Sequence, residues 1–196
     1  MFVENNLNTR VLSFDVGLKN LSFCVVDFLN NEFAIKKWQT ISLRGKNISD
    51  YTIDAISKLG NLQCGCIDYV LIEQQINRNT QMKVLSHVIQ SYFLCGENIP
   101  TNRVLFVSPK TRLDVSSLQH GTVVQRVKQE LFNDIHVTNF SRTDFKKISI
   151  AIAEKYLLRE QHAYWYVFFN THAKKDDYAD SLVQAIAWFS SGSVLD

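Results

Sequence analysis

The fold is decided by the stretch Val11-Leu12-Ser13-Phe14-Asp15-Val16-Gly17-Leu18-Lys19-Asn20. Its first residues are mostly apolar and predict a buried strand, in which apolar residues need not alternate with polar ones. The strand leads to an acid, Asp15, just before glycine and asparagine break it, and a second apolar run, 21–26, predicts a hairpin. A carboxylate beside such a strand costs free energy unless it is paired or binds a cation. Because aspartate also caps turns, both interpretations of Asp15 stay open on local grounds.

The rest of the chain predicts strands that alternate with helices. Three strands in succession make a meander, and the strand–helix alternation that follows it predicts an α/β fold, a mixed sheet with helices on both faces. No repeat or linker interrupts the pattern, so a single domain over 1–196 is expected, with 1–9 as a lead-in. The segment 111–122 is expected to be loop, and the aromatic run 165–169 has no assigned state. The predicted strands are 10–16, 21–28, 33–41, 68–73 and 103–107, and the predicted helices are 51–59, 82–92, 123–132, 141–158 and 176–189.

Composition places the chain among globular proteins. Of its 196 residues, 46% are hydrophobic and 20% are charged, which is ordinary for a soluble domain. No apolar run approaches the ~20 residues that cross a bilayer, and the first residues lack a signal-peptide pattern. With four cysteines, of which Cys64 and Cys66 lack the partners of a zinc site, we expect reduced thiols and an intracellular, reducing compartment. The net charge of +2 is too small to identify a polyanionic partner by itself.

Acidic residues gather at the ends of predicted elements. Glu73 ends the strand 68–73 as Asp15 ends the first strand, and open α/β sheets bind ligands at the carboxyl ends of their strands. If the two strands are neighbours, the two carboxylates lie close together.

The last predicted helix adds three acids within five residues. Asp180 shares a helix face with either Asp177 or Asp176. Acids in a first turn also complement the helix dipole, but three of them exceed what a cap needs. Oxygen ligands without histidine or cysteine suit Mg²⁺ or Mn²⁺, and two such ions about 4 Å apart are the standard device for displacement at phosphorus. The pattern therefore predicts a nuclease site.

Three motifs in this order resemble those of the Holliday-junction resolvases of poxviruses and fungal mitochondria, which are relatives of bacterial RuvC in the ribonuclease H-like superfamily. The likeness spans roughly residues 10–190. The motifs are Asp15-Val16-Gly17-Leu18-Lys19-Asn20-Leu21, then Ile72-Glu73-Gln74-Gln75 with Arg78, then Lys174-Lys175-Asp176-Asp177 with Ala179-Asp180-Ser181.

The resemblance implies a fold and an activity. The fold is ribonuclease H-like, with a five-stranded mixed sheet in the order 3-2-1-4-5 whose first three strands are antiparallel. The activity is paired nicking of four-way DNA junctions by a homodimer, with two Mg²⁺ ions, or Mn²⁺, in each active site. For a viral source, the resemblance places the protein at replication sites in the host cytoplasm, with mitochondrion and nucleus left open.

The resemblance also implies roles for individual residues. Asp15 and Glu73 match the first-strand and fourth-strand acids, and Asp180 matches a final-helix acid. The family has its last two acids three residues apart, which favours Asp177 over Asp176 as the remaining ligand. A basic residue ahead of the last helix stands near the scissile phosphate in this family; Lys147 is the preferred candidate, with Lys146 beside it.

Basic residues at loops and element ends are candidate contacts to DNA phosphates, with solvated surface charge as the alternative for each. Three aromatic residues are candidates for stacking on exposed bases. The apolar stripe of the helix 82–92 predicts either a dimer interface or packing on the sheet. The basic candidates are Lys19, Arg78, Lys110, Arg112, Arg142, Lys146 and Lys174, and the aromatic ones are Tyr164, Trp165 and Tyr166.

Three other functions compete with junction resolution. A nuclease of the same fold that cuts RNA–DNA hybrids or other branched DNA would need contacts to the 2′-hydroxyl that the sequence does not exclude. A non-catalytic nucleic-acid-binding domain is disfavoured because every acid position is filled. A phosphotransferase of the actin-like type normally needs two domains and glycine-rich loops, whereas this chain has 196 residues and 7 glycines.

Overall fold

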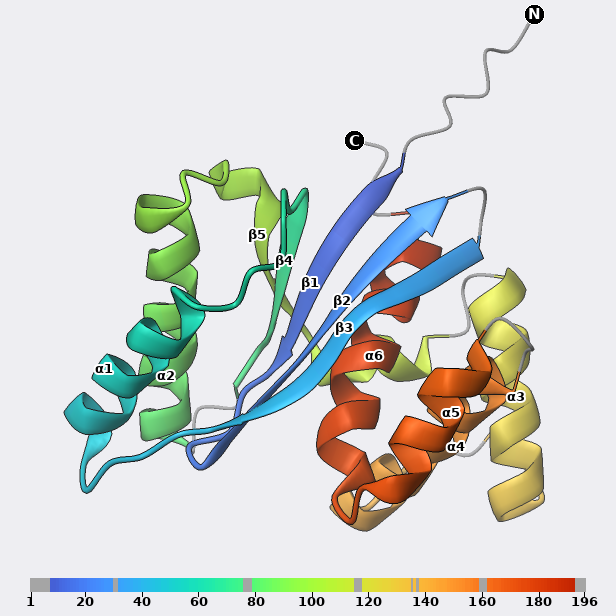
Figure 1. The fold of residues 1–196 in the computed structure, drawn as a ribbon. Coiled ribbons are helices and arrows are strands. Elements are labelled where there is room, and N and C mark those ends of the chain that lie inside the picture. Colours follow the sequence, from blue (N-terminus) through green and yellow to red (C-terminus); the bar gives the residue numbers. More distant parts are fainter. Residues whose placement is uncertain are drawn as a thin grey trace, which may run out of the picture. The chain divides into compact units, whose positions relative to one another are not determined.

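The computed structural model describes residues 8–29, 32–75, 79–114, 118–134, 136, 138–158 and 162–192. It divides the chain into two compact units, 1–106 and 107–196, and each is described by itself. The first unit contains the sheet and two helices, and the second is helical (Figure 1). A single nuclease domain over the whole chain stays a prediction.

Five strands form one sheet in the order β3-β2-β1-β4-β5. β1 (Thr9–Asp15) pairs antiparallel with β2 (Asn20–Leu29), and β2 pairs antiparallel with β3 (Glu32–Ser42). On its other side β1 pairs in parallel with β4 (Tyr69–Glu73), and β5 (Val104–Val107) lies beyond β4. The predicted order and the antiparallel meander are therefore confirmed, and each strand boundary lies within one or two residues of its prediction.

The turn between β1 and β2 depends on Gly17. A Cβ atom at this position would lie 2.5 Å from the carbonyl oxygen of Asn20, well inside van der Waals contact. Glycine therefore lets the chain reverse directly after Asp15, which keeps this acid at the very end of its strand.

Two helices cover one face of the sheet (Figure 1). α1 (Ile48–Leu59) is capped by the side chain of Asn47, and α2 (Thr80–Ser91) continues into a single π-helical turn, η1 (Tyr92–Gly96). One buried cluster joins their inner faces to alternate residues of the strands. The opposite face of the sheet is apolar and buried as well, as expected for a sheet covered on both sides. The cluster includes Leu12, Phe14, Phe23, Val70, Ile72, Ala55, Leu59, Leu85 and Ile89.

The second unit differs from the prediction in two places. The segment 111–122, expected to be loop, contains the end of a 3-10 helix, η3 (Pro109–Leu113), and the start of α3 (Leu118–Phe132). Polar residues and Gly121 at the start of α3 hide its apolar period, so the expected start at 123 is late. The unassigned aromatic run lies in a helix, α5 (Ala163–Thr171), which is apolar on every side and so has no amphipathic period to detect.

The other two helices follow their predictions. α4 (Arg142–Leu157) begins with a capping box in which Ser141 and Asp144 bond to each other's backbone N–H groups, and α6 (Lys175–Ser190) starts one residue before its predicted position. Among the helices that the structure describes, none has the length and apolar character needed to cross a membrane.

Arg10 connects three segments of the first unit. Its guanidinium binds the carboxylate of Asp27 on β2 through two hydrogen bonds, Nε to Oδ1 at 2.6 Å and Nη2 to Oδ2 at 2.8 Å. Its backbone N–H donates to Asp68 Oδ2 at 2.8 Å, and the N–H of Asp68 donates to the Arg10 carbonyl at 2.9 Å. These bonds hold the start of β1 against both β2 and the residue that precedes β4.

The Arg10–Asp27 pair makes a prediction about stability. The hydrogen bonds from Arg10 lower the pKa of Asp27. Asp27→Asn removes the charge that Arg10 binds, so we expect the free energy of unfolding at pH 7 to fall by ~1–3 kcal/mol in urea titrations. A lowered folded-state pKa stabilises above the unfolded carboxyl's pKa and is lost as the pH falls through the folded one, so the difference should shrink below about pH 4.

Lys36→Gln is the matched control. Its ammonium lies 3.7 Å from the same carboxylate, but its side chain is 49% exposed, so we expect a change of less than about 0.5 kcal/mol. A loss of stability in Asp27→Asn that does not change between pH 7 and pH 3 would contradict the ionic origin.

Candidate active site

The first unit brings two of the predicted acids together. Asp15 is the last residue of β1 and Glu73 is the last residue of β4. The parallel register pairs Phe14 with Ile72, so the next residues, Asp15 and Glu73, are neighbours on strands ~5 Å apart. Phe14 and Ile72 both point into the cluster under α1 and α2, and side chains alternate along a strand, so the two acids share the other face.

Glu73 is held in a mostly buried position. Its residue is 9% exposed, and Gln75 Nε2 donates to its Oε2 at 3.0 Å. Asp15 is half-buried. Two carboxylates on adjacent strands repel each other, and the repulsion is stronger away from water, so this pair favours a bound cation.

The second unit brings cations from two elements to the acidic start of α6. Arg112 Nη1 lies 3.1 Å from Asp180 Oδ1, and Lys146 of α4 forms an ion pair with Asp176. The hydrogen bond to Asp176 raises the pKa of Lys146, which therefore stays charged. Lys147, the preferred basic residue, is exposed. The structure thus brings Lys146 to the final-helix acids, and the role of Lys147 stays a prediction.

Arg112 belongs to η3, where a surface loop was expected. Its residue is only 5% exposed, so the prediction that it lies on the surface as a phosphate contact is wrong for this conformation. The reason is that the single turn of η3 directs its guanidinium toward Asp180, a partner that lies 68 positions further along the chain.

Two residues that the sequence analysis missed hold η3 in place. His120 Nε2 lies 3.0 Å from the carbonyl oxygen of Arg112, which can only accept, so Nε2 carries the proton. Its Nδ1 then accepts from the hydroxyl of Tyr156, also at 3.0 Å. Burial lowers the pKa of His120 and keeps its ring neutral, as both bonds require. No local pattern marks a lone histidine at the start of a helix as a partner of η3.

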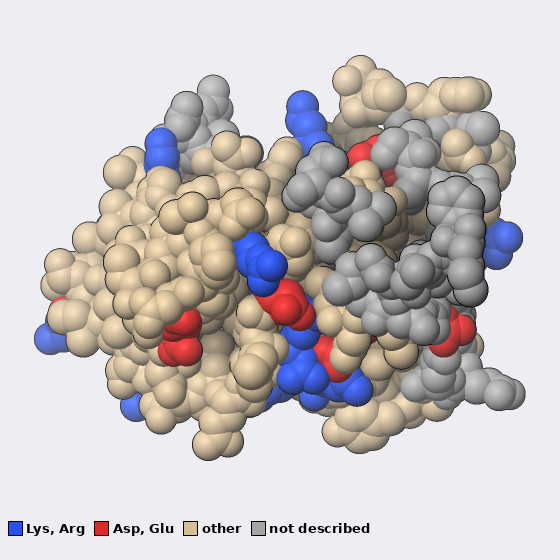
Figure 2. Space-filling view, turned by 90° about the horizontal axis from the view of Figure 1, so that it is seen from above, with Lys and Arg blue, Asp and Glu red and all other residues tan. Residues whose placement is uncertain are grey.

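The other predicted DNA contacts lie on the surface, apart from Arg78, which falls outside the described residues. Figure 2 shows Lys and Arg residues mixed with Asp and Glu on the face in view, without a continuous basic field among the described residues. Phosphate contacts would therefore be made one by one. The exposed candidates are Lys19 in the β1–β2 turn, Lys110 in η3, Arg142 at the start of α4 and Lys174 before α6, with Lys146 engaged as described.

The aromatic candidates lie on α5. Tyr164 is 70% exposed, and its ring contacts that of Trp165, with centroids 5.0 Å apart. Trp165 in turn contacts Phe168, and Phe168 contacts Tyr178 in the first turns of α6. Tyr166 is partly buried. Stacking of these rings on DNA bases stays a prediction.

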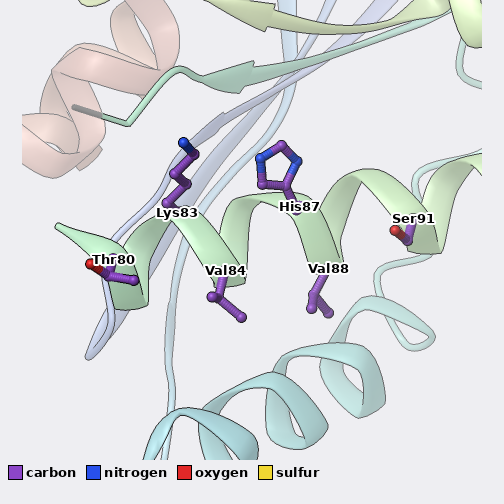
Figure 3. Close-up of a pocket in the computed structure, with 6 residues that line it drawn as sticks. All are labelled: Thr80, Lys83, Val84, His87, Val88 and Ser91. Carbon is purple, nitrogen blue, oxygen red and sulfur yellow. The ribbon is translucent and has the colours of Figure 1, made fainter. Parts of the chain in front are cut away.

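The apolar stripe of α2 has a structural explanation. Leu85 and Ile89 are fully buried in the cluster under the sheet, which supports the packing interpretation. The outer side of α2 carries a shallow pocket without carboxylates, in which Lys83 and His87 point to one side and Val84 and Val88 to the other (Figure 3). A pocket of this composition is not a site for a hard metal ion. The lining residues are Thr80, Lys83, Val84, His87, Val88 and Ser91.

Solved structures with this fold come from three sources, all below 20% identity. A fowlpox virus resolvase in complex with substrate Holliday junction DNA matches with a TM-score of 0.63 and 17% identity, covering 96% of this chain and 100% of that one. The yeast mitochondrial Holliday junction resolvase Ydc2 gives 0.56 and 19%, covering 93% and 80%. Thermus thermophilus RuvC gives 0.53 and 13%, covering 94% and 98%. These likenesses confirm the ribonuclease H-like fold that the motifs implied.

Sequence comparison adds the family. No curated protein sequence gives a significant match. The family model described as "Poxvirus A22 protein" matches residues 9–159, which is more than half of the chain and includes both β1 and β4. The protein therefore belongs to the poxvirus A22 protein family.

Proposed function

We propose that this protein is a Mg²⁺-dependent endonuclease that resolves four-way (Holliday) DNA junctions by paired, symmetric nicks. Three findings support the proposal: the poxvirus family, the fold shared with resolvases of fowlpox virus and yeast mitochondria, and the acids at the strand ends. The observation that carries it is the register of β1 and β4, because this register makes Asp15 and Glu73 neighbours on one face of the sheet.

The donor set suits a hard divalent cation. Among the described residues of either unit alone, no three side chains form a metal-binding group. We therefore propose that Asp15 and Glu73 bind two ions together with Asp180 and one further acid of α6. Since Asp176 is engaged by Lys146, Asp177 is the favoured fourth ligand. All these ligands are carboxylates, which Mg²⁺ and Mn²⁺ prefer.

The protein's own groups then have separate tasks in hydrolysis. When bound, the ions supply activation of the attacking water and stabilisation of the leaving oxygen. The carboxylates hold the ions, and the packed strands beneath Asp15 and Glu73 fix the positions of these two side chains. Lys19, Lys110, Arg142 and Lys174 neutralise DNA phosphates at the surface, so junction binding weakens as salt rises.

Removing single carboxylates tests the site. We expect Asp15→Asn, Glu73→Gln or Asp180→Asn to reduce cleavage of a synthetic mobile junction by at least about 100-fold, because each removes a charged metal ligand. Gel-shift binding of the junction should stay within about threefold, since phosphate contacts dominate affinity. If Asp177 is the fourth ligand, Asp177→Asn should match these variants and Asp176→Asn should not.

Glu130→Gln is the control for these variants. Glu130 is a carboxylate of the second unit that pairs with Lys155 on the surface, and its change should leave cleavage unaltered. Linear duplex and RNA–DNA hybrid serve as control substrates. Equal cleavage of the hybrid would assign the chain to another branch of ribonuclease H-like nucleases, and wild-type turnover in Asp15→Asn or Glu73→Gln would refute the site.

Removal of the metal tests the cofactor. EDTA should abolish cleavage, and excess Mg²⁺ or Mn²⁺ should restore it, because hard oxygen ligands bind these ions reversibly. Ca²⁺, which is larger and accepts irregular coordination, should support junction binding without comparable cleavage. Undiminished nicking in chelator would remove the metal mechanism.

Symmetric nicking needs two sites related by a two-fold axis, so we propose a homodimer. The candidate interface is the outer side of α1 and α2, where Ile53, Ile56 and Val84 are exposed. Sedimentation velocity should show a dimer at assay concentrations, and Val84→Lys should shift it toward monomer and replace paired nicks by single ones. Leu131→Lys on α3 is the matched control, because Leu131 is 43% exposed and Val84 is 42% exposed. A strict monomer that still makes paired nicks would contradict the dimer.

A further inference from the structure

The acidic turn of α6 carries two internal cations that differ in burial. The Arg112 side chain is 6% exposed beside Asp180, whereas the Lys146 side chain is 45% exposed beside Asp176. An ion pair shielded from water is screened little by solvent or salt, whereas an exposed pair contributes ~0–1 kcal/mol. Of the two cations, Arg112 therefore dominates the electrostatics of this turn.

Arg112 is also the better positioned of the two. The bond from His120 Nε2 to its backbone carbonyl ties η3 to α3, and the hydroxyl of Tyr156 ties the same ring to α4. Lys146, by contrast, reaches Asp176 at the end of a flexible, exposed side chain. A guanidinium anchored in this way is held at Asp180 by the fold itself.

We propose that Arg112 is the counter-ion of Asp180 before metal binds, and that a divalent cation must displace it. The inference rests on the proposed role of Asp180 as a metal ligand. The guanidinium offsets the repulsion among the α6 carboxylates while no cation is bound. Since like charges repel, the same guanidinium at 3.1 Å opposes a divalent cation on this carboxylate, so the stability of the metal-free protein is gained at the expense of metal affinity.

The test is Mn²⁺ binding to the full chain, measured by isothermal titration calorimetry together with the melting temperature in EDTA. Arg112→Gln keeps a hydrogen-bond donor near Asp180 but removes the charge, and we expect Mn²⁺ to bind about tenfold more tightly and the metal-free protein to melt at a lower temperature. Arg112→Lys keeps the charge and should bind Mn²⁺ within about threefold of wild type. Lys146→Gln is the exposed control and should change affinity less than about twofold.

The results separate this inference from the proposed function. Mn²⁺ binding to Arg112→Gln that equals or falls below that of wild type would overturn the counter-ion role and leave the metal site intact. If wild type binds no Mn²⁺ even at millimolar concentration, both the proposed metal site and this inference fail.

A second measurement needs only folded wild-type protein. The side-chain Nε–H signal of Arg112 in a ¹⁵N NMR spectrum can be assigned through its absence in Arg112→Lys. Displacement by Mg²⁺ should shift this signal in a saturable way, with the same midpoint as metal binding. A signal that stays unchanged while Mg²⁺ saturates the protein would overturn the proposal even if Arg112→Gln does not fold.

Discussion

The parallel pairing of β1 with β4 is the constraint on which the rest of this structure depends. Its register, Phe14 beside Ile72, places two acids at one sheet edge and on one face. A slip by one residue would turn Asp15 or Glu73 toward the apolar cluster under α1 and α2, where a carboxylate has no partner. The bonds of Arg10 to β2 and to the residue before β4 hold the start of this pairing in place, at the opposite end of β1 from the acid. The structural charge pair and the functional carboxylate thus occupy the two ends of one strand.

The same electrostatic problem recurs in both units with different solutions. In the sheet, Asp15 and Glu73 lie on adjacent strands, so burial and mutual repulsion favour a cation between them. In α6, protein cations already accompany the acids: Arg112 at Asp180 and Lys146 at Asp176. This difference gives the second unit a stable acidic turn while it awaits substrate and metal. It also explains why η3, His120 and Tyr156 form a buried polar network, since an arginine held at a carboxylate needs a fixed backbone beneath it.

Local patterns predicted most of the fold and half of the site chemistry. The five strands, their order and the helices α1, α2, α4 and α6 follow from apolar runs, from caps such as Ser141 and from the resemblance to resolvases. The failures have local causes. α5 is apolar all round and lacks a period, and the start of α3 is hidden by polar residues and glycine. Arg112 was assigned to the surface because a basic residue next to a proline in a short segment has no pattern that reveals a buried partner far along the chain.

What the sequence by itself determined is which residue types stand at the ends of which elements. An apolar run that stops at an acid, twice, and a helix that opens with three acids already restrict the chemistry to hard oxygen ligands, because this follows from residue identity alone. Only the tertiary structure decided which charges meet. That Asp15 faces the same side as Glu73 depends on strand register, and that Asp180 carries Arg112 depends on the packing of η3 against α3, α4 and α6. Such pairings join residues far apart in the chain, and no local periodicity encodes them.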